Sequence, residues 1–141
     1  MKRIPTPYIA GVTAFSIMLL LAASMLFGAG GSPLMKPSEA YALIQKNKGN
    51  SQFIVLDVRT PEEFKAGHIE GAVNVDFNAR TFREEIEKLG RGKTYLVYCR
   101  TGRRSAEAVR MMRELGFANI LRFEGDIVRW KAENLPLVNQ G

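Results

Sequence analysis

The chain has 141 residues, a formal net charge of +6 and 46% hydrophobic residues, as expected for one small folded domain. Its single cysteine excludes an intramolecular disulfide and a metal site built from cysteines. The basic residues do not form a helix face interleaved with aromatic residues, so the pattern argues against nucleic-acid binding. The positive charge fits a small anionic substrate better.

The amino-terminal region resembles a membrane segment. Lys2 and Arg3 precede an uncharged stretch over residues 8–31. Because about 20 apolar residues can cross a bilayer as a helix, residues 8–30 are predicted to anchor the chain in a membrane. The positive-inside rule then places the remainder outside the cytoplasm, on the periplasmic side. The alternative is a signal peptide over residues 1–31 that is cleaved, with secretion to the periplasm. The anchor is favoured because the apolar run is longer than a usual signal core.

The rest of the chain is predicted to hold a linker over residues 32–37, one α/β domain over 38–135 and a tail over 136–141. Hydrophobic periodicity and turn residues locate the elements. Helices are predicted over residues 38–47, 61–66, 79–89, 104–115 and 126–133, and strands over 53–57, 72–75, 94–98 and 120–123. Strands that alternate with helices predict a parallel sheet with helices on both faces.

Cys99 lies where the predicted strand 94–98 gives way to a helix. A thiol there is at the carboxyl end of a strand and faces the amino end of the next helix, where free backbone N–H groups favour an anion. Arg100, Arg103 and Arg104 add positive charge. Such surroundings are typical of a nucleophilic thiolate, whereas an inert buried cysteine seldom has so many charged neighbours.

Two motifs resemble those of the rhodanese (thiosulfate sulfurtransferase) family. Cys99, followed by four residues, Arg104 and then Ser105, matches the active-site loop of that family. The stretch LDVRTPEEFKAGHIEGAVNV, residues 56–75, is similar to its amino-terminal signature. The resemblance covers residues 36–133. One departure concerns the family's frequent paired glycines before a carboxy-terminal tryptophan, since here Gly125 is followed by Asp126 before Trp130.

The resemblance implies a rhodanese-like domain that transfers sulfur through a persulfide on Cys99. The donor is expected to be thiosulfate or a related anion, and the acceptor cyanide, a thiol or a protein. No metal or organic cofactor is required. The substrate is expected to bind the loop formed by Arg100, Thr101, Gly102, Arg103 and Arg104. Within it, Arg100 and Arg103 would orient the donor and Arg104 would brace the loop.

Two residues of the first motif are expected to support the site. Asp57 ends a strand at the active-site edge and is predicted to pair with a loop arginine or with backbone amides. Arg59 is predicted to form an ion pair with Glu63. His68, the only histidine, belongs to the structural part of the motif rather than acting as a base.

Three other functions fit parts of the pattern. A phosphatase or arsenate reductase uses a similar loop but typically has five residues between Cys and Arg, whereas here there are four. A thiol–disulfide oxidoreductase needs a second cysteine, which the chain lacks. A non-catalytic carrier that delivers persulfide sulfur to a partner protein would use the same loaded Cys99, so it stays open as the alternative to an enzyme.

Overall fold

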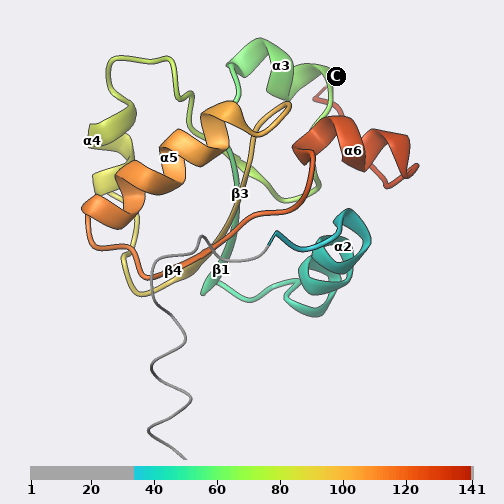
Figure 1. The fold of residues 1–141 in the computed structure, drawn as a ribbon, viewed down its shortest axis with the longest axis horizontal. Coiled ribbons are helices and arrows are strands. Elements are labelled where there is room, and N and C mark those ends of the chain that lie inside the picture. The colour runs from blue at the N-terminus through green and yellow to red at the C-terminus, as the bar shows by residue number, and fades with distance from the viewer. Residues whose placement is uncertain (1–33, 141) are drawn as a thin grey trace, which may run out of the picture. The chain divides into compact units, whose positions relative to one another are not determined.

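A computed structural model describes residues 34–140, and the predicted membrane anchor over residues 8–30 lies outside this range. The elements follow the order α2 (Pro37–Lys46), β1 (Phe53–Asp57), α3 (Pro61–Ala66), β2 (Val73–Asn74), α4 (Phe82–Glu87), β3 (Thr94–Tyr98), α5 (Arg103–Glu114), β4 (Asn119–Leu121) and α6 (Asp126–Ala132) (Figure 1). None of the helices within residues 34–140 is long and apolar enough to span a bilayer.

The four strands form one parallel sheet in the order β2-β1-β3-β4. The two central strands pair along their whole length, from Phe53 opposite Thr94 to Asp57 opposite Tyr98. Parallel strands all end at the same edge of a sheet. Asp57 is the last residue of β1, and Cys99 directly follows β3. Both therefore lie at the carboxyl edge of the sheet, as the sequence predicts.

Helices cover both faces of the sheet, and alternate residues of β3 point to opposite faces. Val97 packs on the face covered by α4 and α5, whereas Leu96 and Tyr98 pack on the face covered by α2 and α6. Figure 1 shows these two pairs of helices on either side of the strands. The predicted α/β architecture is confirmed, and the end of β3 is packed between two apolar layers.

The domain includes residues at both ends that were predicted to be linker or tail. Met35 forms a parallel bridge with Phe123, and Val138 forms an antiparallel bridge with His68. The backbone N–H groups of His68 and Val138 each donate to the other's carbonyl at 2.9 Å. These segments are ordered by backbone pairing, which hydrophobic periodicity does not reveal.

Candidate active site

Cys99 follows the last residue of β3 and lies in the floor of an open hollow of about 420 Å³. Only 1% of the residue's surface is exposed. The hollow is lined by Phe77, Asn78, Cys99, Arg100, Thr101, Arg103, Arg104 and Glu107. Four of the five loop residues predicted to bind substrate therefore surround the thiol. The hollow has room for a small ligand beside the buried cysteine.

Gly102 is the one loop residue that does not line the hollow, and its backbone determines the course of the loop. Its N–H donates to the Cys99 sulfur at 3.1 Å. Its φ of 115° is a conformation that favours glycine. A Cβ at this position would also lie 3.1 Å from Nη2 of Arg122. Glycine therefore lets the backbone curl around the sulfur and present an N–H group to it.

The loop arginines differ in their partners. The exposed Arg100 and Arg103 form no ion pair within residues 34–140. Arg104 instead binds Glu63 through two hydrogen bonds of 2.7 and 2.8 Å. These bonds lower the pKa of Glu63 from 4.5 to about 2. Arg104 thus ties α5 to α3, while the other two cations can meet an anion.

Glu63 is itself fixed by the start of α3. Thr60 accepts a hydrogen bond from the backbone N–H of Glu63, and the Glu63 carboxylate accepts one from the N–H of Thr60. This is a capping box, with Pro61 at the first helical position. The cap places the carboxylate opposite Arg104, a residue 41 positions later in the chain.

Asp57 and Arg59 form a buried ion pair beside the site. The carboxylate of Asp57 accepts from Nη2 of Arg59 at 2.7 Å, and also from its Nε and its backbone N–H. Nη2 of Arg59 donates in addition to the carbonyl of Gly67 at 2.7 Å. The predicted pair between Arg59 and Glu63 is therefore wrong. Arg59 turns inward to the strand end, which leaves Glu63 to the arginine of α5.

Three residues that were not predicted to bind substrate form hydrogen bonds with Cys99 or its loop. Ser105 Oγ lies 3.6 Å from the Cys99 sulfur and donates to Oδ2 of Asp126 at 2.6 Å. The same carboxylate oxygen accepts from the backbone N–H of Cys99 at 2.7 Å. Arg122 donates to Ser105 Oγ at 3.2 Å and to the Gly102 carbonyl at 2.9 Å. Ser105 was marked in the sequence by its place after Arg104 in the active-site motif, and Asp126 by the departure from paired glycines. No sequence signal pointed to Arg122.

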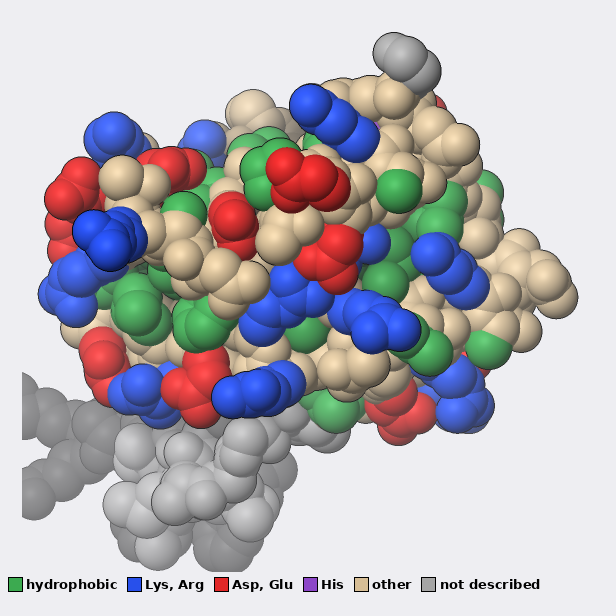
Figure 2. Space-filling view, turned by 90° about the horizontal axis from the view of Figure 1, so that it is seen from above, with side chains coloured by type: hydrophobic (Ala, Val, Ile, Leu, Met, Phe, Trp, Pro, Cys, Tyr) green, Lys and Arg blue, Asp and Glu red, His purple; other side chains and the backbone are tan. Residues whose placement is uncertain are grey.

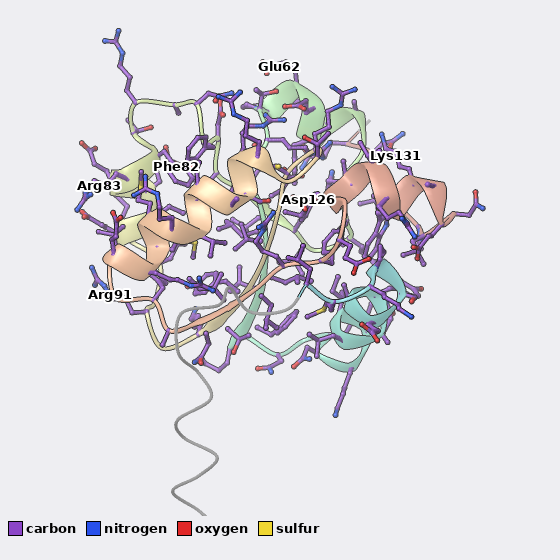
Figure 3. The ribbon with its side chains drawn as sticks, in the orientation of Figure 1. Glu62, Phe82, Arg83, Arg91, Asp126 and Lys131 are labelled. Carbon is purple, nitrogen blue, oxygen red and sulfur yellow. The ribbon has the colours of Figure 1, made fainter. Side chains whose placement is uncertain are left out.

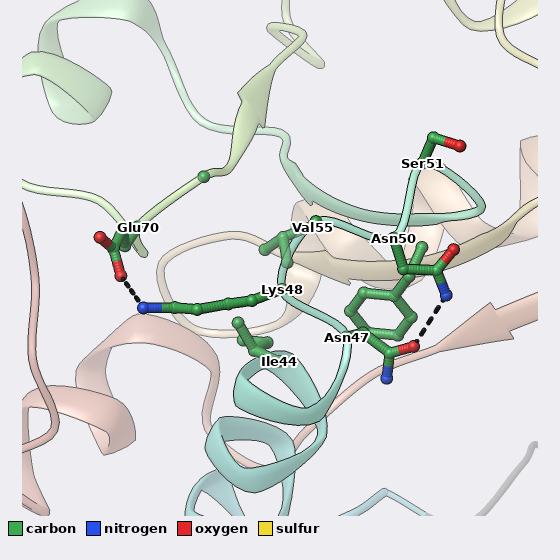
Figure 4. A pocket seen from close by; sticks show the side chains of 10 residues that line it. Ile44, Asn47, Lys48, Asn50, Ser51, Val55 and Glu70 are labelled. Carbon is green, nitrogen blue, oxygen red and sulfur yellow. Dashed lines mark hydrogen bonds and ion pairs between the residues drawn. The ribbon is translucent and has the colours of Figure 1, made fainter.

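Other hollows lie elsewhere on the domain. One of about 460 Å³ shares Arg100 with the Cys99 hollow and is also lined by Val128 and Lys131. Another, of about 530 Å³, lies beside the loop that joins α2 to β1, away from the thiol (Figure 4). Lys48 and Glu70 form an ion pair of 3.0 Å across it. The face of the molecule seen from above in Figure 1 carries cationic and anionic side chains together (Figure 2).

The model of the rhodanese-like domain family matches residues 36–133. The chain belongs to this family, and the match has the extent that the motifs predicted.

Curated relatives of the chain carry sulfur-transfer names. A putative sulfurtransferase, YtwF of Bacillus subtilis, is 30% identical, with 72% of this chain and 96% of that protein covered. A sulfurtransferase of Allochromatium vinosum is 26% identical over 71% of this chain and 92% of the relative. The chain also matches a probable adenylyltransferase/sulfurtransferase, MoeZ of Mycobacterium tuberculosis, at 35% identity, but spans only 21% of its length. The family and these names support a role in sulfur transfer.

Solved structures show the same fold. A rhodanese-related protein from Thermoplasma volcanium is 34% identical, with a TM-score of 0.66, and covers 77% of this chain and 100% of its own. A full-length protein from Lactobacillus plantarum is 26% identical, with a TM-score of 0.63, covering 88% and 96%.

Proposed function

We propose that the protein is a sulfurtransferase that moves sulfane sulfur from thiosulfate, or a related anionic donor, to a thiophilic acceptor through a Cys99 persulfide. The observation that carries this proposal is that Cys99 lines the same hollow as Arg100, Arg103 and Arg104. A reactive cysteine is expected in an electropositive, accessible pocket of this kind.

The first half-reaction loads the enzyme. The Cys99 thiolate attacks the outer sulfur of thiosulfate, a new S–S bond forms, and the S–S bond of the donor breaks. Sulfite leaves with the electron pair of that bond. Arg100 and Arg103 hold the dianion because both lack a carboxylate partner in the described domain. The persulfide that remains carries its negative charge on the outer sulfur.

The second half-reaction unloads the enzyme. A nucleophilic acceptor, cyanide or a thiolate, attacks the outer sulfur, and Cys99 leaves as a thiolate that can react again. The scheme is ping-pong, with one covalent intermediate. The Gly102 N–H, 3.1 Å from the Cys99 sulfur, stabilises negative charge on that sulfur each time it forms.

A steady-state assay with thiosulfate and cyanide tests the proposal. Double-reciprocal plots for the wild-type protein should give parallel lines, as a ping-pong scheme requires. Cys99→Ser should show no activity above background but should unfold at the wild-type temperature. Activity in Cys99→Ser comparable to wild type would overturn the assignment. A wild-type protein that loads sulfur but passes it only to a protein acceptor would be a carrier rather than this enzyme.

A further inference from the structure

Asp126, the first residue of α6, is a buried carboxylate next to the nucleophile. Figure 3 shows its side chain in the interior of the domain, and only 1% of the residue is exposed. Its backbone has a φ of 49°, which is uncommon for a residue other than glycine. Its Oδ2 holds two donors, but its Oδ1 is buried without a hydrogen-bond partner, 3.8 Å from Nη2 of Arg122. Strain and an unpaired buried atom together are typical of a functional position.

Ser105 connects this carboxylate to the thiol. A serine hydroxyl has one proton to donate and two lone pairs that accept. The proton of Ser105 lies toward Oδ2 of Asp126, because a carboxylate oxygen at 2.6 Å outcompetes the Gly102 carbonyl at 3.2 Å. One lone pair accepts from Nε of Arg122 at 3.2 Å. The remaining lone pair faces the Cys99 sulfur at 3.6 Å and can accept its S–H proton.

We propose that Asp126 is a positioning residue that holds the Ser105 proton away from Cys99 and thereby disfavours negative charge on the inner sulfur. The inference rests on the proposed function for its place in the reaction. While the Ser105 hydroxyl donates to Asp126, a thiolate at Cys99 faces a lone pair of the Ser105 oxygen and keeps only the Gly102 N–H as a donor. The thiolate receives a hydrogen bond from Ser105 only if the Ser105 hydroxyl turns away from Asp126. The buried carboxylate then keeps only one hydrogen-bond donor, the Cys99 N–H.

The persulfide does not carry this penalty. Its inner sulfur is bonded to two atoms and is neutral, and its negative charge lies on the outer sulfur, in the hollow lined by arginines. Asp126 therefore favours the loaded form of Cys99 over the free thiolate. Sulfur, once bound, is therefore retained until an acceptor enters.

The test is the rate at which iodoacetamide, a neutral reagent, alkylates Cys99 in the full-length protein at pH 7. Asp126→Asn preserves the shape of the side chain, and asparagine tolerates a positive φ. A neutral amide oxygen attracts the Ser105 proton less strongly, so alkylation should be about fivefold faster than in wild type, the effect of about 1 kcal/mol. Asp126→Gly suits the backbone and should also accelerate alkylation.

Ser105→Ala separates a hydrogen-bond effect from a general effect of charge. In that background, Asp126→Asn should change the alkylation rate less than twofold, because the hydroxyl that connects the two residues is gone. Glu124→Gln, which removes an exposed carboxylate two positions away, is the matched control and should alkylate at the wild-type rate. Thermal unfolding checks that each variant is folded.

Acceleration that depends on Ser105 supports the inference. Two results overturn it: no acceleration in folded Asp126→Asn and Asp126→Gly, or an equal acceleration with and without Ser105. The alkylation comparison needs no sulfur donor. Its failure is therefore distinct from a failure of the proposed function, in which wild-type protein does not take up sulfur from thiosulfate.

Discussion

The residues around Cys99 divide into those that face the hollow and those that hold the loop. Arg100 and Arg103 are exposed and have no carboxylate partner among residues 34–140, so their charges are available to a ligand. Gly102 and Arg122 lie behind the loop and contact each other. Substitutions in the two groups should therefore differ: loss of the first weakens donor binding, and loss of the second disturbs the loop itself.

The double variant Arg100→Ala/Arg103→Ala should raise the KM for thiosulfate about tenfold and flatten its dependence on salt, because two cations near a dianion are removed. The melting temperature should change by about 2 °C or less, as neither side chain is buried. Arg113→Ala, on the distant part of α5, is the matched control and should leave the KM unchanged. An unaltered KM in the double variant would show that these arginines do not bind the donor.

Gly102→Ala should lower sulfur transfer at least tenfold and destabilise the domain by about 1–2 kcal/mol. Its φ of 115° is strained for alanine, and the new Cβ would press on Nη2 of Arg122. Gly92→Ala is a suitable control, because nothing lies within 4 Å of a Cβ there. Denaturant unfolding and steady-state rates measure both effects. Wild-type activity in Gly102→Ala would mean that the loop does not need this conformation.

Local sequence was enough to locate Cys99 and the loop, because the strand, the nucleophile and the arginines follow one another directly. It could not reveal Asp126 as a site residue. The carboxylate reaches the Cys99 N–H from 27 positions later in the chain, through the packing of α6 against the sheet edge. Spacing along the chain carries no information on such a contact, and only the missing glycine at 126 marked the position.

At the scale of elements, α3 and α5 are joined by the bond between Glu63 and Arg104. The sequence predicted both helices and even the bracing role of Arg104, but it paired Glu63 with Arg59. Short spacing along a chain favours an ion pair between near neighbours such as Arg59 and Glu63. The actual partner of Glu63 depends on how two parallel strands bring the starts of their following helices together.

This pair makes stability depend on pH. Glu63 has a folded pKa of about 2, below its ordinary value of 4.5. Its contribution is thus fully present above about pH 5 and is lost as pH falls from there through about 2. Glu63→Gln should destabilise the domain at pH 7 by about 1–2 kcal/mol, a value limited by the partial exposure of both side chains.

Thermal unfolding between pH 7 and pH 2 measures this effect. The difference in melting temperature between wild type and Glu63→Gln should shrink as the solution becomes more acidic. Glu62→Gln, which removes the neighbouring carboxylate on the same helix, provides the control. A difference that stays constant down to pH 2 would show that the ionised carboxylate is not what stabilises the contact.

Element boundaries were predicted less well than the elements themselves. The strands 53–57 and 94–98 match β1 and β3, which are apolar runs with clear ends. The helix predicted over 79–89 is shorter, because α4 covers only Phe82–Glu87. Residues 79–81 form a turn before it, in which the N–H of Phe82 donates to the carbonyl of Ala79. Periodicity detects the apolar face of this segment but not where its backbone becomes helical.

For the whole molecule, we propose that residues 8–30 anchor the chain in a membrane with the domain on the periplasmic side, as their uncharged composition and the basic residues before them indicate. The full-length protein should fractionate with membranes and resist extraction by high salt. A chain that starts near residue 34 should be soluble and active. A shortened chain in the soluble periplasmic fraction would favour a cleaved signal, and protection of the domain from protease in spheroplasts would contradict the orientation.

The measurement that most directly tests sulfur transfer through Cys99 is the intact mass of the protein after incubation with thiosulfate. Wild-type protein should gain the mass of one sulfur atom and lose it again when cyanide is added. Cys99→Ser should gain nothing under the same conditions. A wild-type mass that stays unchanged, or an equal gain in Cys99→Ser, would contradict the persulfide on which the proposed reaction depends.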